Sequence, residues 1–430
     1  MSSIFDGNQI YKWAKDLFPI CRSIAGPGNK KTLDYLRKIN KLIEIKHFDS
    51  GEQAFDWTIP NEWHINQAWI KDEKGNEIIN FKNHNLHVMN YSAPVDKVVS
   101  FDELSDKLFS IPEMPNSIPY VTSYYTEDWG FCIQHSKKQR LDKKSKYHVF
   151  IDSQFIKGKM HYGECLIKGR SKKEILLSTY ICHPSMANNE LSGPLVTTAL
   201  INKISSQNNF FSYRILFLPE TIGSIAYLSK FHKKMKSHTH GGFVITCVGD
   251  EGKFSYIPSR LGNTISDRAA LHVLSNQKED FQKYTWSDRG SDERQYCAPG
   301  IDLPIASVTR SKYGEYNEYH TSDDNLNFIS PKGLQGSAEL LYKITSVIEK
   351  NCKPKTQFLC EPMLGKRGLY PSQSTLDTQQ AVQDILDIIS YSDGSKDLIE
   401  IAQLINKPVW EIYDMIDQLI QKDVLQVENE

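Results

Sequence analysis

Four apolar runs in the middle of the chain each end beside a side chain that can bind a metal ion or carry a proton. EILLSTYIC is followed by His183, YRILFLP by Glu220 and GGFVITCV by Asp250, and LPIASVT is followed at a short distance by His320. Such dense apolar runs are typical of strands buried in a central sheet. In open α/β sheets, ligands bind beyond the carboxyl ends of the strands. The pattern therefore predicts a metal site assembled at one sheet edge from residues that are distant in sequence.

Each of these residues also has a purely structural interpretation. Glu220 could cap the helix that follows it, because carboxylates favour the first turn, or it could act as a general base. Asp250, in the sequence GDEG, could be a turn residue or a ligand. Asp292 and Glu293, in RGSDERQY, are two further acids that could face the site.

The sequence around these residues predicts an α/β sandwich, because the apolar runs alternate with segments of helical character. Residues 4–45 are expected to form two helices around the loop CRSIAGPGNKKT. Residues 48–147 contain short aromatic and β-branched runs separated by turns, which predicts an inserted antiparallel β domain. The α/β domain is then expected to comprise residues 1–47 and 148–355.

The last segment, residues 356–430, reads as three helices with short turns and predicts a winged-helix-like domain. From residue 380 onward it carries roughly eleven acidic residues against three lysines. That charge has the wrong sign for contacts with nucleic-acid phosphates. We therefore expect a packing or protein-contact module and no nucleic-acid partner.

The overall composition is that of a globular protein. The chain has 430 residues, 51 Lys and Arg against 52 Asp and Glu, and 40% hydrophobic residues. No apolar run approaches the roughly 20 residues of a membrane helix, and the charged, amphipathic N-terminus is unlike a signal peptide. We expect a cytoplasmic protein with no membrane partner. The eight cysteines include no CxxC pair, so a zinc ribbon is not expected, and Cys182 and Cys247 are expected to be small buried hydrophobes.

The order of these motifs resembles the co-catalytic zinc aminopeptidases of clan MH. The matching segments are His183 before the NNELSG turn, Glu220 in PETIGS, Asp250, SDERQY, and His320 in YHTSDDN. The whole chain is more similar still to bacterial aminopeptidase-like domain proteins associated with polysaccharide biosynthesis. The segments that carry this likeness are RSIAGPGNKKTL, FDWTIPNEW, SYYTEDWGFC, CHPSMANNELSGP and EYHTSDDN. The resemblance implies an inserted β domain and a C-terminal winged-helix-like domain.

The chain departs from the two-zinc pattern at two positions. The family's bridging aspartate falls at Asn189, followed by Glu190, and the second Glu of the Glu-Glu pair is Thr221. An amide is a weaker ligand than a carboxylate and carries no charge to bridge two cations. Three alternatives follow. Glu190 substitutes as a ligand in the full two-zinc site; or one zinc ion binds through His183, His320 and an acid such as Glu190 or Asp250 and keeps one position for water; or no metal binds. The prediction adopted is one zinc ion.

The function predicted from these residues is a zinc-dependent hydrolase of aminopeptidase type that cleaves an amide of a small or peptide-like substrate. Glu220 is the expected general base, with metal ligands among His183, His320, Asp250 and Glu190. The residues expected to contact substrate are Asp292, Glu293, Asn189 and, from the family resemblance alone, Arg22. The alternative is a catalytically silent binding or assembly protein on an aminopeptidase scaffold. A peptide, an aminoacylated sugar precursor and an acyl-amino sugar all remain open as substrates, and a homo-oligomer is compatible with the resemblance.

Overall fold

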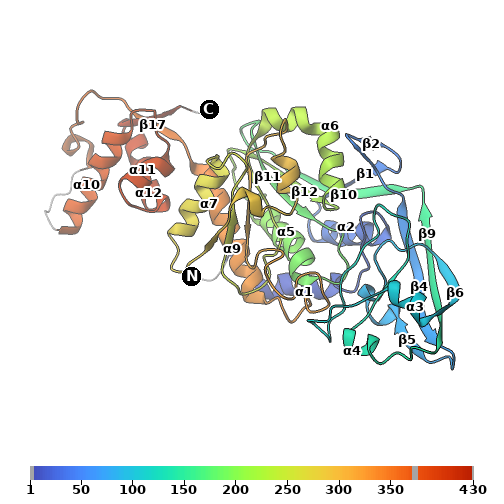
Figure 1. The fold of residues 1–430 in the computed structure, drawn as a ribbon. Helices are drawn as coiled ribbons and strands as arrows, with labels where there is room; N and C mark the ends of the chain where they lie inside the picture. Colours follow the sequence, from blue (N-terminus) through green and yellow to red (C-terminus); the bar gives the residue numbers. More distant parts are fainter. Residues whose placement is uncertain (1–3, 370–375, 429–430) are drawn as a thin grey trace. The chain divides into compact units, whose positions relative to one another are not determined.

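The structure is a computed structural model that describes residues 4–369 and 376–428 (Figure 1). The chain forms two compact units. The larger comprises residues up to 266 together with 281–341, and the smaller comprises residues 267–280 together with 342 onward. The expected α/β class, with a winged-helix domain at the C-terminal end, is confirmed.

The larger unit is built on a mixed eight-stranded sheet within the described residues. Its strands, in spatial order, are β1 (Glu44–Asp49), β10 (Lys159–Ile167), β12 (Ser212–Leu218), β11 (Glu174–Tyr180), β13 (Thr239–Val244), β16 (Ile305–Thr309), β14 (Ser255–Ile257) and β15 (Gln282–Lys283). The four central strands β12, β11, β13 and β16 are parallel. Every residue of β11, β12 and β16 is buried, which explains their unbroken apolar sequences. The four apolar runs singled out in the sequence are these strands.

Helices pack on both faces of the sheet. Outside the β insertion, the helices of this unit are α1 (Gly7–Leu17), α2 (Pro27–Ile39), α5 (Ser192–Ile204), α6 (Ile222–His238), α8 (Glu293–Tyr296) and the first part of α9 (Pro331–Lys350). Gly193 of α5 lies against the Thr179 side chain of β11, whereas the Tyr296 hydroxyl of α8 lies 2.8 Å from Ser178 Oγ of the same strand. Because neighbouring residues of a strand point to opposite faces, α5 and α8 cover opposite sides of the sheet.

The expected β insertion is present as a separate antiparallel sheet. It contains β5 (Glu77–Asn80), β4 (Glu62–Asp72), β9 (Lys146–Ile156) and β6 (Val95–Ser100), in that order. Short elements complete this region: β2 (Gln53–Ala54), β3 (Trp57–Thr58), η1 (Phe81–Asn83), η2 (Asn85–His87), α3 (Phe101–Asp106), β7 (Leu108–Phe109), β8 (Phe131–Cys132) and α4 (His135–Lys138). β9 crosses residue 147, the predicted boundary of the insertion.

The smaller unit contains the three helices α10 (Leu376–Tyr391), α11 (Leu398–Leu404) and α12 (Val409–Gln421) and the strand pair expected of the winged-helix segment, together with parts of two helices that begin in the larger unit. Those parts are most of α7 (Ile265–Ser275) and the end of α9, and the remaining elements are β17 (Lys353–Thr356), η5 (Gly365–Arg367) and β18 (Leu425–Glu428). β17 and β18 pair antiparallel. A capping box between Asp397 and Glu400 begins α11, and the Val409 N–H of α12 donates to the His272 ring.

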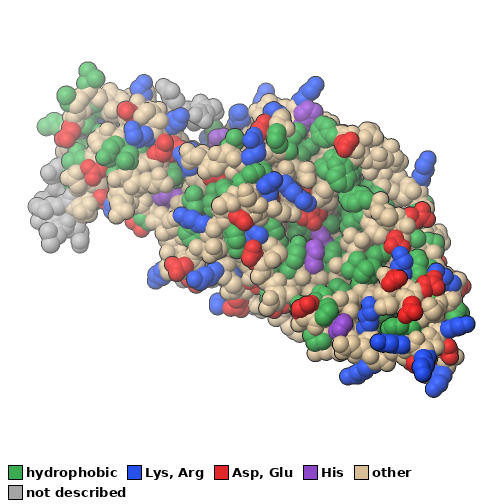
Figure 2. All heavy atoms as spheres, viewed as in Figure 1, with side chains coloured by type: hydrophobic (Ala, Val, Ile, Leu, Met, Phe, Trp, Pro, Cys, Tyr) green, Lys and Arg blue, Asp and Glu red, His purple; other side chains and the backbone are tan. Residues whose placement is uncertain are grey.

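The surface carries charges of both signs. In the face shown in Figure 2, basic and acidic side chains alternate over the molecule without a broad patch of one sign, consistent with the formal charge of -1. No described helix has the length and apolar character needed to cross a membrane. All eight cysteines are free, and Cys182 and Cys247 are buried as expected.

Candidate functional site

The central strands bring His183, Glu220 and His320 together, as the sequence predicts. The rings of His183 and His320 lie 5.3 Å apart between centroids. Glu220 Oε2 lies 3.5 Å from His183 Nε2. These residues follow β11, β12 and β16, whose carboxyl ends meet at one edge of the sheet. We call His183, His320 and Glu220 the open cluster.

A chain of buried side chains fixes the orientation of His183. Its Nδ1 lies 2.8 Å from Glu190 Oε2, and Glu190 Oε1 lies 3.8 Å from the Arg22 guanidinium. Arg22 also donates from Nε to the His183 carbonyl at 3.0 Å and from Nη1 to the Leu17 carbonyl at 2.9 Å. Glu190 and Arg22 are therefore placed to hold the imidazole with Nε2 directed toward Glu220. Arg22 has no exposed surface, and its contacts place it behind His183, where it supports the orientation of the ring.

His320 is held by aromatic rings and has a free nitrogen. Its ring stacks on Tyr319 at 3.9 Å, and Tyr120 from the β insertion lies 5.1 Å from the rings of both His320 and His183. The Nε2 atom of His320 is buried without a hydrogen-bond partner. No group of the protein is hydrogen-bonded to this buried nitrogen. It is therefore free to bind a metal ion or to form a hydrogen bond with a ligand.

The loop that carries Glu220 is held in a strained conformation. Thr221 has φ 64° and ψ −74°, a region that β-branched residues avoid. Its N–H donates to Asp292 Oδ1 at 2.8 Å, and its hydroxyl accepts from Arg294 at 2.8 Å. Asp292 also accepts from Ser224, while its second oxygen is buried and unpartnered. These contacts fix the Glu220 backbone beside the two histidines and leave one oxygen of Asp292 available.

Burial favours the neutral forms of the groups in the cluster. It lowers the pKa of His183 and of His320 to about 3, so both imidazoles keep a lone pair at neutral pH. It raises the pKa of Glu190 to about 8. The pKa of Glu220 is also raised to about 8, by burial first and by the Asp292 carboxylate second. A cation bound here would favour the charged carboxylates, so this donor set has the electrostatic character of a cation site.

Three other acids near the sheet edge accept hydrogen bonds from neighbouring protein groups. We call Asp250, Asp324 and Glu293 the anchored acids. Asp324 accepts from the N–H groups of residues 187–189 and from the Tyr316 hydroxyl. Glu293 Oε1 accepts from two backbone N–H groups and from Tyr313. Each stabilises a loop or turn, which leaves Glu293 poorly suited to hold a substrate ammonium.

Asp250 has the same anchored character. Its two oxygens accept from Gly252 N–H, from Asn188 Nδ2, and from both the N–H and the hydroxyl of Ser311. It does not join His183 in the group of potential ligands found among the described residues. Of the two interpretations that the sequence left open for Asp250, this arrangement corresponds to the structural one.

Asn189 stands at the position of the family's bridging aspartate, and its side-chain amide is hydrogen-bonded within the protein. Asn189 lies in a π-helical turn, Ala187–Leu191, that precedes α5. Its Nδ2 donates to the Tyr180 hydroxyl at 3.0 Å, and its Oδ1 is buried without a partner. With an amide here and Thr221 in place of the second glutamate, the chain supplies no carboxylate at either position, which disfavours a bridged pair of ions.

A metal ion could bind on either of the two ring nitrogens of His183, and the two positions differ in their surroundings. Cys182, His183 and Glu190 offer ligand atoms within 4.8 Å of one another, but all three are buried. An ion there would lie beside the permanently charged Arg22 and would use the nitrogen that already contacts Glu190. The Nε2 side of His183 faces Glu220, whose side chain is 21% exposed. This side fits a catalytic ion, because such an ion needs an open position, with Glu190 orienting the histidine from behind.

Sequence reasoning missed several residues of the site. Tyr319 adjoins His320 in the YHT motif, and Arg294 lies within SDERQY, so both stand in motifs already noted. Tyr120 comes from the β insertion, and no pattern in PYVTSYY indicates that it would reach the histidines. Asp324 follows His320 closely, but its role depends on N–H groups contributed by a segment more than 130 residues away.

Comparison with known proteins agrees with this architecture. Residues 11–351 match a family described as a domain of unknown function (DUF4910), and residues 351–427 match a winged helix-turn-helix family. A Clostridium acetobutylicum protein, named for polysaccharide biosynthesis and an aminopeptidase-like domain, is 42% identical over 402 residues, which are 92% of this chain and 91% of the relative. The chain belongs to this family of aminopeptidase-like domain proteins. The resemblance inferred from the motifs is thereby confirmed.

Solved structures extend the comparison. A crystal structure from Clostridium acetobutylicum, named as a peptidase, superposes with a TM-score of 0.92 at 40% identity, covering 98% of this chain and 96% of the other. A zinc aminopeptidase from Bacillus subtilis superposes with a TM-score of 0.61 at 14% identity, covering 81% of this chain and 96% of the other. At that identity the likeness concerns the fold alone. The larger unit thus has the fold of zinc aminopeptidases.

Proposed function

We propose that the protein is a zinc-dependent hydrolase of aminopeptidase type that cleaves an amide bond in a small or peptide-like substrate. The observation that carries this proposal is the meeting of two imidazoles, the buried His183 and the half-buried His320 with its unpartnered Nε2, beside the Glu220 carboxyl group. Catalytic zinc sites combine imidazole and carboxylate ligands, and the two histidines would supply two of the three protein ligands. The zinc aminopeptidases of similar fold support the choice of metal.

His183 and His320 would hold one zinc ion, which when bound polarises a carbonyl oxygen and activates water. Glu220 accepts the proton of the attacking water and returns it to the amine nitrogen as the carbon–nitrogen bond breaks. Glu190 and Arg22 position His183. One carboxylate oxygen of Asp292 fixes the Thr221 loop. Its second oxygen has no partner, so among Asp292 and the anchored acids Asp292 is the residue that would attract a substrate ammonium.

The test is metal analysis combined with hydrolysis of aminoacyl p-nitroanilides and dipeptides, using protein purified without chelator. We expect close to one zinc per chain, and we expect His320→Ala to lose both zinc and activity. His47→Ala, which removes an exposed histidine on β1, is the matched control and should retain both. Absence of zinc from the wild type, or full zinc content in His320→Ala, would contradict the proposal.

A second candidate function is binding or assembly without catalysis. It is favoured by Asn189 and Thr221, which replace carboxylates that the two-zinc enzymes use. Under this alternative the purified protein contains no stoichiometric zinc and hydrolyses none of the aminoacyl amides. The same experiment therefore separates the two functions.

A further inference from the structure

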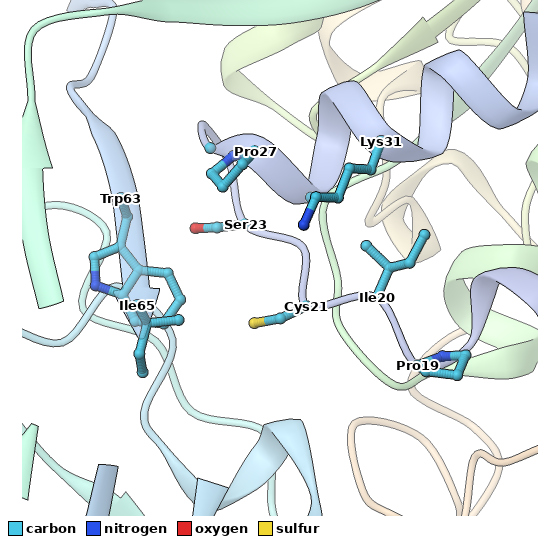
Figure 3. A pocket seen from close by; sticks show the side chains of 10 residues that line it. Pro19, Ile20, Cys21, Ser23, Pro27, Lys31, Trp63 and Ile65 are labelled. Atoms are coloured by element: carbon cyan, nitrogen blue, oxygen red, sulfur yellow. The ribbon is translucent and has the colours of Figure 1, made fainter. Parts of the chain in front are cut away.

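A cavity of about 320 Å³ lies between the loop that joins α1 to α2 and strand β4 of the insertion. Figure 3 shows Ser23, Cys21 and Lys31 on one side of this space and Trp63 and Ile65 on the other. The volume is that of a pocket for a small molecule. The loop is the CRSIAGPGNKKT segment, which the open cluster uses only through Arg22.

The first turn of α2 supplies one wall of the cavity. Gly26 precedes this helix of 13 residues, no side chain caps it, and Pro27 occupies its first turn. Uncapped N–H groups and the positive end of a helix dipole attract anions. A helix end alone does not define a binding site, so the side chains around it decide the matter.

Ser23 provides a donor that the protein itself leaves unused. Its residue is 3% exposed, and its Oγ is buried with no hydrogen-bond partner. The backbone N–H of Ser23 donates to Asn29 Oδ1 of α2 at 3.3 Å, which ties the serine to the helix. Figure 3 shows the hydroxyl directed into the cavity. Leaving a buried hydroxyl unbonded is unfavourable, and a ligand acceptor in the cavity would remove that cost.

Lys31 provides the positive charge. Its ammonium group points toward the cavity (Figure 3), and the lining contains no acidic residue. The neighbouring Lys30 pairs with Asp34 at 2.8 Å, whereas Lys31 forms no ion pair among the described residues. The cavity therefore presents a cation, a hydroxyl donor and a helix N-terminus without an opposing carboxylate.

Two glycines allow the walls to approach this closely. A Cβ atom on Gly28 would lie 1.9 Å from the Cys21 carbonyl oxygen, and one on Gly26 would lie 2.6 Å from the Trp63 carbonyl oxygen. The opposite wall is apolar, and it is rigid because the Trp63 indole donates to the Ser92 carbonyl at 2.8 Å. The site therefore combines donors for an anion with a fixed apolar surface.

We propose that this cavity binds the phosphate group of a small phosphorylated ligand, whose body packs against Trp63 and Ile65. The phosphate would accept from Ser23 Oγ and from the first turn of α2, with Lys31 as its counter-ion. This site is separate from the open cluster. Arg22 lies next to Ser23 in the same loop but donates to His183, so the two sites use different side chains.

The test is calorimetric titration of the full chain with phenyl phosphate, inorganic phosphate and benzoate, in a phosphate-free buffer at constant ionic strength. We expect saturable binding of phenyl phosphate, about tenfold tighter than inorganic phosphate because the ring buries apolar surface. Benzoate should bind more weakly than phenyl phosphate. No saturable binding of either phosphate compound, or equal affinity for benzoate, would overturn the proposal.

Three variants locate the binding. Lys31→Gln should weaken phenyl phosphate binding by about tenfold, the effect of losing one charge-assisted contact. The matched control Lys30→Gln removes the same charge one residue away and should bind as the wild type does. Ser23→Ala should weaken binding similarly, and its melting temperature without ligand should not fall, because the hydroxyl it removes has no partner. Binding that is unchanged in both Lys31→Gln and Ser23→Ala would place the phosphate elsewhere and refute the assignment.

Discussion

The open cluster and the anchored acids contain similar side chains at the same sheet edge, yet they are bonded very differently. Asp324 accepts four hydrogen bonds from the protein, three of them from backbone N–H groups. Glu220 has as its close partner a histidine nitrogen at 3.5 Å, and His320 Nε2 has no partner. A carboxylate whose donors come from the backbone stabilises structure, whereas one that faces another titratable group can move a proton. The predictions below test this division, starting with the largest expected effect.

Glu220→Gln should reduce hydrolysis by roughly 10² to 10⁴-fold, because it removes the group that carries the proton. Its zinc content should equal that of the wild type, since histidines hold the ion in this account. The matched control is Glu251→Gln, which removes an exposed carboxylate that pairs with Lys332. Loss of zinc from Glu220→Gln would mean that Glu220 is a ligand, and unchanged activity would remove it from the chemistry altogether.

Asp324→Asn should lower the free energy of unfolding by about 2–4 kcal/mol, since hydrogen bonds to a charged acceptor contribute about 1.5–3 kcal/mol each and the new amide faces N–H donors. The measurement is urea unfolding followed by circular dichroism. Asp323→Asn is the neighbouring control; Asp323 accepts from the Ser117 hydroxyl, so a smaller loss is expected. If Asp324→Asn were as stable as the wild type but inactive, an anchored acid would be acting in catalysis. That result would contradict the distinction between the open cluster and the anchored acids.

Glu190→Gln should weaken zinc binding by about 10–100-fold, the usual effect of removing a carboxylate that orients a metal-binding histidine. The variant keeps the size of the side chain and replaces its carboxyl group, which lies 3.8 Å from the Arg22 guanidinium, with an amide. Zinc affinity can be measured by competition with a chromogenic chelator. An affinity loss of many orders of magnitude would instead indicate that Glu190 binds the ion directly through the buried group with Cys182.

The lowered pKa values of His183 and His320 should make the metal-free protein sensitive to acid. His320 has its folded pKa lowered to about 3, and in the unfolded chain the pKa is about 6.5. The unfolded state therefore takes up the proton first, so this residue costs stability as the pH falls below about 6.5. Between pH 7 and 5 in the presence of a chelator, His320→Asn should lose about 1–2 kcal/mol less than the wild type. Equal losses would show that His320 is not held neutral by burial.

The sequence predicts the elements of this molecule better than the bonding of its site. The strands β11, β12, β13 and β16 are dense apolar runs, so their existence and the residues that follow them can be read directly. The difference between Glu220 and Asp250 cannot be read in this way. Both follow a buried strand, but Asp250 receives donors from Asn188 and Ser311, which are 62 and 61 residues away.

The partners of His183 show the same limit. Arg22 contacts His183 from the loop between α1 and α2, and Tyr120 contacts it from the β insertion. The sequence around each of these residues does not predict that it lies close to His183. The family resemblance suggested a place near the site for Arg22, but it did not indicate that the guanidinium would be fully buried behind Glu190. Long-range packing decides these contacts, and a sequence pattern with a period of two or 3.6 residues carries no information about them.

The central claim is that one metal ion binds on the Nε2 side of His183, shared with His320. An anomalous-scattering map recorded at the zinc edge on crystals grown without chelator tests it most directly. The account predicts a single peak within bonding distance of His183 Nε2 and His320 Nε2. A peak among Cys182, His183 Nδ1 and Glu190, two peaks bridged at Asn189, or no peak near either histidine would contradict it.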